Sequence, residues 1–413
     1  MAALKTSMPK LKILISGAGI AGPCLAYWLS RTRLNTSITI IERSPSPRIS
    51  GQALDIHDSA IEVVKKMGLL DAVRSYSTTE EGTRFVNASG KAIAEFMAPS
   101  LTAEYEILRA DLSELFLKAT ERMSNIRYVY GQSVESLEQT DAKVNVTFSS
   151  GSKDSFDLFV AADGAASKTR SMILNEETVK NCSQSLGMYN AFFSIPRIPS
   201  DERLWQIYNI PQGRGIMIRP HRNNTTMGAY MTIATAARGV CDQDLDDALR
   251  DGIDAKKRVL HERFNDAGWE AKRVLDGMDQ AEDFYMSSAT KVTLSKWTNK
   301  RAVLLGDAAW ASFGATSLAI EGAYSLAGEI GKIKGTKDVP RALEKYEEVF
   351  RPIYVEKGDL PPGFPQIMFP QSWGLRVRDA FLWTVSRTGL HKLFLAYSET
   401  KTVFKLPEYD WRI

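Results

Sequence analysis

Cysteine and histidine are scarce in this chain. Its 413 residues include three cysteines, Cys24, Cys182 and Cys241, and four histidines, at positions 57, 221, 261 and 391. The cysteines are too few and too far apart for a disulfide framework, and they show no spacing typical of metal ligands. The histidines are also too scattered to indicate a metal cluster. We therefore expect neither a disulfide scaffold nor a metal site.

A strong charge imbalance and a long apolar run are absent as well. The formal net charge is only +3. This argues against nucleic acid or an anionic membrane as the main partner, because both need a concentrated basic patch. No stretch is long and apolar enough for a transmembrane segment, and the apolar run at residues 13–15 is too short for a secretion signal. We expect a cytoplasmic protein of two or three domains.

A glycine-rich loop follows the first predicted strand. Gly17, Gly19 and Gly22 form the pattern G-x-G-x-x-G between an apolar run at residues 11–16 and a stretch with helical periodicity. In such a loop the glycines permit a tight turn, the approach of a pyrophosphate and close packing of helix on strand. The next predicted strand ends at Glu42, where a carboxylate can bind the ribose of an adenosine. The pattern predicts a dinucleotide site, and a glycine turn that binds nothing is the alternative.

Two later turns combine glycine and aspartate after apolar strands. Asp163 precedes Gly164, and Gly306 precedes Asp307. Since Asp-Gly is a common turn pair, the first of them fits a loop at a phosphate site or a plain turn equally well. Arg109 stands just ahead of a predicted helix, where a cation gains nothing from the helix dipole. This position favours a functional role for Arg109, although a solvated helix start remains the alternative.

Taken in order, these motifs resemble the group A FAD-dependent monooxygenases of the para-hydroxybenzoate hydroxylase type. Within that family the chain looks most similar to the tetracycline-modifying and polyketide-tailoring members, over roughly residues 11–360. The residues that carry the resemblance are GAGIAG (17–22), IIERSPSPRISGQALDI (40–56), ILRADLSELF (107–116), VAADGAASKTR (160–170), LLGDAA (304–309) and TSLAIEGAYSLAGE (316–329).

The resemblance implies an α/β fold. A Rossmann-like FAD-binding domain would be interleaved with an antiparallel-sheet substrate domain and followed by C-terminal helices. The expected boundaries are 10–75, 107–172 and 290–335 for the FAD-binding domain, 76–106 and 173–289 for the substrate domain, and 336–413 for the C-terminal helical region. The last region, with aromatic residues at Phe381, Trp383 and Phe394, either caps the active site or provides a packing or dimer helix.

The resemblance also implies the chemistry. NADPH or NADH would reduce FAD as a transient co-substrate, and the reduced flavin would react with O₂ to a C4a-hydroperoxide. That species would hydroxylate or epoxidise an aromatic or polyketide-like secondary metabolite. The chain could act as a monomer or a homodimer. Its implied FAD-binding residues are Gly17, Gly19, Gly22 and Glu42 at the ADP half, Asp163 near the pyrophosphate, Asp307 at the ribityl chain, and Arg48, Gly51, Ala53 and Arg109 beside the flavin.

The substrate side is harder to predict. Residues 203–234 alternate between apolar and polar, which predicts antiparallel strands joined near Gly213 and Asn223-Asn224. Arg219 and Tyr230 on these strands are candidates for substrate contact or catalysis. Polar alternation is ordinary on a half-solvated sheet, so surface or edge positions remain the commoner interpretation of both residues.

The turn after Asp307 departs from the family pattern. Only residues 311–317 separate Trp310 from Leu318, with no proline and a single glycine, Gly314. The loop is rebuilt and still holds flavin, or flavin or redox turnover has been lost, or the sequence contains an error here. We favour the first and expect a looser flavin ring, because the motifs on both sides are intact. The functional alternatives are a non-redox cyclase or scaffold on the same fold and, third, a flavin oxidase or dehydrogenase.

Overall fold

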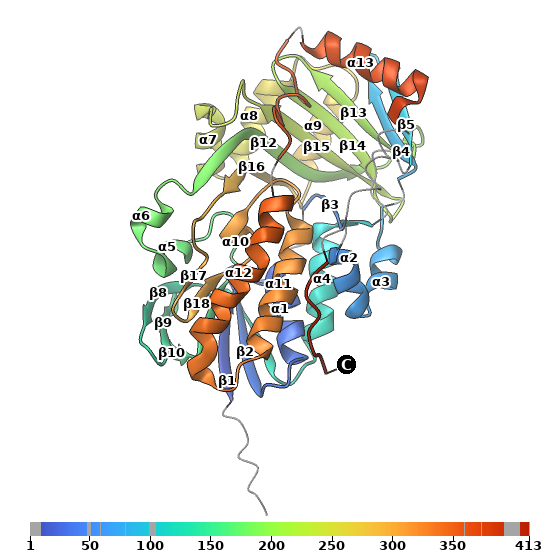
Figure 1. The fold of residues 1–413 in the computed structure, drawn as a ribbon. Coiled ribbons are helices and arrows are strands. Elements are labelled where there is room, and N and C mark those ends of the chain that lie inside the picture. The colour runs from blue at the N-terminus through green and yellow to red at the C-terminus, as the bar shows by residue number, and fades with distance from the viewer. Residues whose placement is uncertain are drawn as a thin grey trace, which may run out of the picture.

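The computed structural model describes residues 10–47, 51–57, 59–78, 80–98, 105–358, 360–372, 374–391 and 405–412. Two residues singled out above, Arg48 and Phe394, lie outside these ranges. The fold has two main sheets, one in the lower half and one in the upper half of Figure 1. The predicted α/β class is confirmed.

The lower sheet has six strands in the order β17-β18-β11-β1-β2-β7. All its pairs are parallel except β17 with β18. The bounds are β1 (Leu11–Ser16), β2 (Thr36–Glu42), β7 (Ile126–Tyr130), β11 (Leu158–Ala161), β17 (Thr298–Asn299) and β18 (Ala302–Leu304). Strands β11 and β18 are wholly buried, which explains their unbroken apolar sequences. The carboxyl ends of β1, β11 and β18 place all three sequence motifs at one edge of the sheet.

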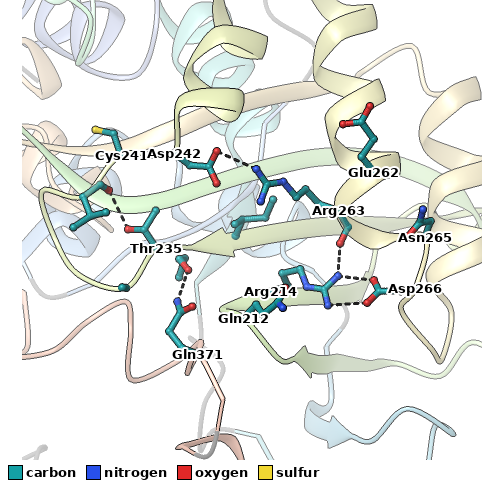
Figure 2. Close-up of a pocket in the computed structure, with 14 residues that line it drawn as sticks. Gln212, Arg214, Thr235, Cys241, Asp242, Glu262, Arg263, Asn265, Asp266 and Gln371 are labelled. Carbon is teal, nitrogen blue, oxygen red and sulfur yellow. Dashed lines mark hydrogen bonds and ion pairs between the residues drawn. The ribbon is translucent and has the colours of Figure 1, made fainter.

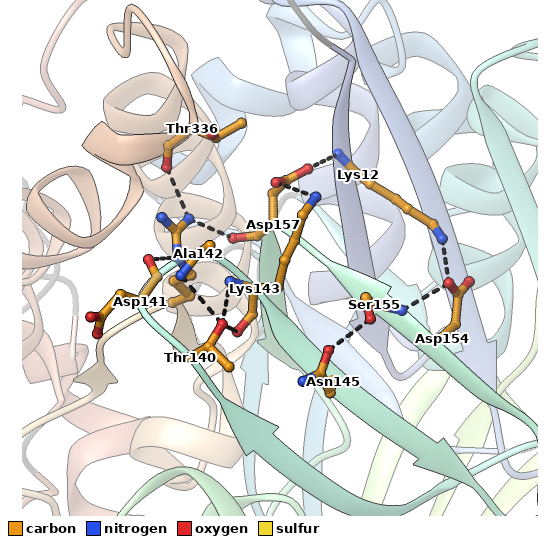
Figure 3. A network of polar contacts seen from close by, with 11 residues as sticks. Lys12, Thr140, Asp141, Ala142, Lys143, Asn145, Asp154, Ser155, Asp157 and Thr336 are labelled. Atoms are coloured by element: carbon orange, nitrogen blue, oxygen red, sulfur yellow. Dashed lines mark hydrogen bonds and ion pairs between the residues drawn. The ribbon is translucent and has the colours of Figure 1, made fainter.

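A polar network closes the opposite edge of this sheet (Figure 3). The Lys12 backbone N–H donates to Asp157 over 2.8 Å, and the Lys143 ammonium donates to the same carboxylate over 2.7 Å. Arg301 donates to the Thr336 carbonyl over 2.9 Å. Because Lys12, Asp157 and Arg301 stand at the amino ends of β1, β11 and β18, the network stabilises the sheet far from the motif-bearing edge.

The upper sheet has seven strands in the order β16-β12-β15-β14-β13-β4-β5, with one parallel pair, β13 with β4. The bounds are β4 (Gly82–Val86), β5 (Ala92–Met97), β12 (Ser183–Pro196), β13 (Leu204–Ile210), β14 (Arg214–Pro220), β15 (Thr226–Ala234) and β16 (Tyr285–Val292). The predicted turns after β13 and β14 are confirmed. Gly213 and Asn224 take positive φ values of 73° and 58° there, a conformation that glycine and asparagine tolerate best.

Helices and two small sheets complete the fold. Strands β8 (Val134–Gln139), β9 (Val144–Phe148) and β10 (Lys153–Phe156) form one small sheet, and β3 (Ala53–Asp55) with β6 (Glu106–Leu108) form the other. The helices are α1 (Ala21–Ser30), α2 (Ser59–Lys66), α3 (Leu70–Ser75), α4 (Arg109–Thr120), α5 (Arg170–Ile173), α6 (Glu176–Val179), α7 (Gln243–Arg250), α8 (Ile253–Phe264), α9 (Ala271–Gln280), α10 (Asp307–Trp310), α11 (Thr316–Gly331), α12 (Val339–Lys357) and α13 (Gly374–Thr388). A 3₁₀ turn, η1, spans Thr336–Asp338.

The C-terminal region is only partly helical. Helix α12 packs on α11, and α13 packs on β5 at the top of Figure 1. Residues 405–412 form no helix and return to the lower half, where the Trp411 ring lies 4.7 Å from that of Trp28 in α1. The expectation of a helical region over 336–413 is therefore wrong for this segment, because packing against α1 and α11 decides its conformation.

The described ranges lack two features, a membrane-spanning helix and a metal-binding cluster. No helix there has both the length and the apolar character needed to cross a bilayer. Nor do His, Cys, Asp and Glu side chains gather there in threes or more in a way that could bind a metal ion.

Candidate active site

A cavity of about 1450 Å³ is lined by residues of both main sheets. Pockets for one small ligand usually measure about 300–1,000 Å³, so this cavity has room for a cofactor and a substrate together. Gly17, Glu42 and Asp163 line it from the lower sheet. Arg219 and Tyr230 line it from the upper sheet.

A second cavity, of about 610 Å³, lies beside α7 and α8 (Figure 2). Its main polar groups bind each other: Arg214 contacts both carboxylate oxygens of Asp266, over 2.6 and 3.1 Å. No sequence motif contributes to its lining. The large cavity, where the motifs meet, is therefore the candidate site.

The glycines of the first loop differ in what surrounds them: two lie against neighbouring backbone, and one borders open space. A Cβ added at Gly17, whose φ is +119°, would lie 2.2 Å from the Ala162 carbonyl oxygen. One added at Gly22 would lie 2.1 Å from the Gly17 oxygen. At Gly19, which lines the cavity, an added Cβ would meet no atom within 4 Å. The loop therefore leaves open space at Gly19, as the binding of a dinucleotide phosphate requires.

Glu42 lies beside this loop. Its carboxylate accepts the backbone N–H of Ala18 over 3.1 Å and that of Ser44 over 3.0 Å. A carboxylate has about four acceptor positions, so two remain for ligand hydroxyls. The position fits the predicted contact with a ribose.

Three of the residues expected beside the flavin, Gly51, Ala53 and Arg109, lie in or next to the short sheet of β3 and β6. Gly51 has a φ of +139°, and a Cβ there would lie 2.9 Å from the Cβ of Arg109. Arg109 opens α4 instead of preceding it, and its backbone N–H donates to Gln52 over 2.9 Å. The Ala53 N–H donates to the Tyr230 hydroxyl over 3.2 Å, so this wall of the cavity is attached to the upper sheet.

The two motif aspartates also line the cavity. Asp163 accepts the Thr169 hydroxyl over 3.0 Å, and its buried Oδ1 has no hydrogen-bond partner among the described residues. Burial raises the pKa of Asp307 above that of an ordinary carboxyl, while the positive charges of Arg109 and Arg170 oppose the shift. An unpartnered oxygen and a desolvated carboxylate both indicate room for hydrogen-bond donors of a ligand.

The surface interpretation of Arg219 and Tyr230 is wrong, since only 8% and 7% of these residues are exposed. Helices α7, α8 and α9 cover one face of the upper sheet, and the other face borders the cavity, so β14 is buried throughout. The Arg219 guanidinium contacts the carboxylates of Glu80 and Glu106. Neither carboxylate was predicted, and no local sequence signal marks them.

These charges shift one another's pKa values. Burial raises the pKa of Glu80 to about 8; Glu106 adds to the shift and Arg219 opposes it. Burial alone would lower the pKa of Arg219, but the two carboxylates outweigh it and raise that pKa. Burial and the neighbouring Glu106 thus favour the protonated form of Glu80, and the two carboxylates favour the charged form of Arg219.

The shortened turn remains part of the cavity wall. Ala311, Ser312, Phe313 and Gly314 line the cavity, and Gly314 has a positive φ of 77°. The Phe313 ring lies 4.9 Å from that of Phe364, which also lines the cavity. The turn therefore closes between α10 and α11 without the proline of the family loop.

Comparisons with known proteins agree with this geometry. The sequence matches the family described as "FAD binding domain" over residues 10–354. The FAD-dependent monooxygenase asL4 of Sarocladium schorii is 33% identical over 441 residues, which cover 97% of this chain and 99% of that protein. Monooxygenase CTB7 of Cercospora beticola is 32% identical, over 97% of this chain and 98% of its own length.

A solved structure extends the match to three dimensions. The crystal structure of the tetracycline destructase Tet(51) has a TM-score of 0.77 and 30% identity to this chain, and the match covers 98% of this chain and 100% of that one. Fold, motif order and relatives thus agree over nearly the whole sequence. The chain belongs to the group A FAD-dependent monooxygenases, in their polyketide-tailoring branch.

Proposed function

We propose that the protein uses NADPH or NADH and O₂ to hydroxylate or epoxidise an aromatic or polyketide-like small molecule. One oxygen atom of O₂ enters the substrate, and the other leaves as water with the two electrons of the nicotinamide and two protons. The observation that carries the proposal is the large cavity, which extends from the glycine loop to an end lined by Phe192, Trp205 and Met217. FAD supplies the redox chemistry when bound.

The residues present fit FAD. The open space at Gly19 would receive the pyrophosphate, and Glu42 would bind the ribose. Asp163 and Asp307 would accept hydrogen bonds from the phosphate end and the ribityl chain. Arg109 would lie beside the flavin, held by its backbone contact to Gln52. Arg48 was predicted for the same wall but lies outside the described residues.

The substrate end would exclude water and orient a ring. Phe364, Met368 and Phe369, from the segment between α12 and α13, line this end together with the upper sheet. An apolar wall of this kind protects reactive species from water. Arg219 and Tyr230 would provide the polar contacts that orient the substrate.

We also propose a domain division that follows the sheets. The segments 10–75, 107–172 and 290–335 would form the FAD-binding domain, since they supply the lower sheet and its glycine loop. The segments 76–106 and 173–289 would form the substrate domain around the upper sheet. Residues 336–413 would brace both domains through α12, α13 and the segment 405–412.

The test is direct. Purified protein is given FAD, its absorption spectrum is recorded, and the oxidation of NADPH and NADH in air is followed with a hydroxylated anthraquinone present. We expect a yellow protein that incorporates one isotopically labelled oxygen atom from O₂ into the quinone or a related aromatic. A protein that takes up no FAD would support a non-redox role. NADPH oxidation that yields only peroxide, with every aromatic tried, would support an oxidase.

A further inference from the structure

The Arg219 guanidinium lies between two buried carboxylates. Its Nε and Nη2 donate to one oxygen of Glu80 over 2.9 and 2.7 Å, and Nη2 also contacts Glu106. The exposed fractions of the three side chains are 10%, 2% and 3%. The Trp205 ring lies 4.2 Å from the guanidinium carbon, and the Thr78 hydroxyl donates to Glu106 over 2.6 Å. Packing and hydrogen bonds therefore hold the guanidinium in one place.

Counting charges gives a reason for a proton to reside on this unit. One guanidinium neutralises one carboxylate, and a second buried carboxylate without a compensating charge is costly. The other oxygen of Glu80, Oε1, is buried and has no hydrogen-bond donor among the described residues. A proton on Glu80 removes the excess charge. The raised pKa of Glu80 agrees with this assignment.

Other titratable groups surround the unit. Asp55 stands opposite Glu106 in the β3–β6 pair. His57 lies 3.8 Å from the Asp55 carboxylate. The Tyr230 ring lies 5.9 Å from the Arg219 guanidinium, and burial raises the pKa of Tyr230. His221 follows Arg219 by two residues, and burial lowers its pKa. Loss of the Glu80 proton would thus add negative charge to a wall that already carries carboxylates.

The unit faces the substrate through Arg219. Arg219, Trp205 and Tyr230 line the cavity, whereas Glu80 and Glu106 are absent from its lining. The hydrogen bonds of Arg219 use Nε and Nη2, and within the described ranges no partner occupies Nη1. Its neighbours in the lining, Phe192 and Met217, are apolar. Asp55 lines the cavity too, so Arg219 is a cationic group in a wall of mixed character. Such a guanidinium is suited to an anionic oxygen atom on an otherwise apolar ring.

We propose that Glu80 is a positioning residue, which holds one proton beside Arg219. This proton allows the guanidinium to bind an anionic oxygen of an aromatic substrate. Loss of the proton weakens the binding of such anions. The proposal rests on the assignment of this cavity to the substrate, but not on turnover. With Glu80 protonated, the unit is neutral and its positive end faces the cavity. With Glu80 ionised, the unit carries one negative charge and repels the same oxygen.

The experiment uses the FAD-loaded protein and two naphthalenes of nearly equal shape. 2-Naphthoate is anionic at every pH used, and 2-naphthamide is neutral. Their dissociation constants are measured by calorimetry between about pH 6.5 and pH 9.5, a range that spans the titration of Glu80. The variants are Glu80→Gln, which keeps the neutral state, and Glu81→Gln as control. Glu81 is the next residue, and its side chain is 60% exposed.

We expect wild-type protein to bind 2-naphthoate roughly tenfold more weakly at the upper end of this range, as one added charge a few ångströms away would cause. Binding of 2-naphthamide should change little. Glu80→Gln should remove the pH dependence for naphthoate, and Glu81→Gln should keep it. An unchanged naphthoate profile in Glu80→Gln, or no naphthoate binding at any pH, would overturn the proposal.

Two further comparisons keep the outcome clear. If Glu80→Gln does not fold, the ratio of naphthoate affinity to naphthamide affinity in the wild-type protein still tests the proposal. A ratio that does not change with pH would contradict it. Oxygen incorporation is measured separately. A protein that shows the predicted binding profile but transfers no oxygen would contradict the proposed function and leave the role of Glu80 standing.

Discussion

The backbone N–H of His57 donates a hydrogen bond to the Ser317 hydroxyl over 3.0 Å. This contact attaches the first turn of α11 to the segment that carries Gly51 and Ala53. The shortened turn at 311–317 is thus anchored at its end to the wall expected beside the flavin ring. A second hydroxyl of the same turn, Ser312, donates to the Gly358 carbonyl on the opposite side, over 3.3 Å.

Ser317→Ala should loosen the flavin end of the cavity. Loss of one hydrogen bond should weaken FAD binding by about 0.5–1.5 kcal/mol and raise the peroxide released per NADPH oxidised. FAD titration and a peroxide assay measure both effects. Ser312→Ala is the matched control, since its hydroxyl binds away from that wall. Equal effects of the two variants would show that general loosening of the turn, and not this contact, is responsible.

The glycines of the first loop should respond differently to alanine. Gly19→Ala should fold normally but bind FAD at least about tenfold more weakly, equivalent to about 1.4 kcal/mol, because the added methyl group enters the space for the phosphate. Gly17→Ala should lower the apoprotein melting temperature, because of its positive φ and the contact with Ala162. Gly335→Ala, also in open space, is the control. Wild-type FAD affinity in Gly19→Ala would place the phosphate elsewhere.

Glu42→Ala should weaken FAD binding by roughly 1–3 kcal/mol, the range for losing a charged hydrogen-bond acceptor. The carboxylate also accepts the Ala18 N–H, so part of the loss would come from a less ordered glycine loop. FAD titration is therefore combined with thermal unfolding of the apoprotein. An unchanged affinity would exclude Glu42 from the ribose contact, and a large drop in apoprotein stability would indicate a structural role.

Arg109→Met and Asp307→Asn should reduce flavin occupancy more than apoprotein stability. Both side chains line the cavity, and each is expected to contact the cofactor. Absorbance at the flavin band gives the occupancy, and thermal unfolding without FAD gives the stability. Lys118→Met on the same helix as Arg109 is the control, because Lys118 is 53% exposed and forms an ion pair with its neighbour Glu114. A matching fall in apoprotein stability would assign Arg109 and Asp307 to the core.

Glu80 should make folding stability sensitive to pH. Its pKa is raised from an ordinary 4.5 to about 8, so between these values the folded protein holds a proton that the unfolded chain has released. Folding stability should therefore fall as the pH rises through this window. Melting temperatures across the window should decline less steeply in Glu80→Gln than in wild-type protein. Parallel curves would show that Glu80 ionises normally.

Local geometry explains what could be predicted from the sequence. The loop at Gly17, the strand ending at Glu42 and the turn at Asp307 each depend on neighbouring residues and on the rule that parallel strands end at one edge. The strands at 203–234 were predicted for the same reason, since alternation and turn residues are local signals. Sequence alone was therefore sufficient to predict which motif residues meet at one end of the cavity.

Only the tertiary structure determined the surroundings of Arg219, at the end of the cavity that we propose for the substrate. Alternation along β14 shows which residues share a face, but it does not show whether that face is exposed. Arg219 is buried because helices cover one face of the sheet and the cavity borders the other. Its partners Glu80 and Glu106 stand 139 and 113 residues away along the chain. The proton that we propose on Glu80 depends on folding, which brings two buried carboxylates to one guanidinium. No local stretch of sequence contains this arrangement.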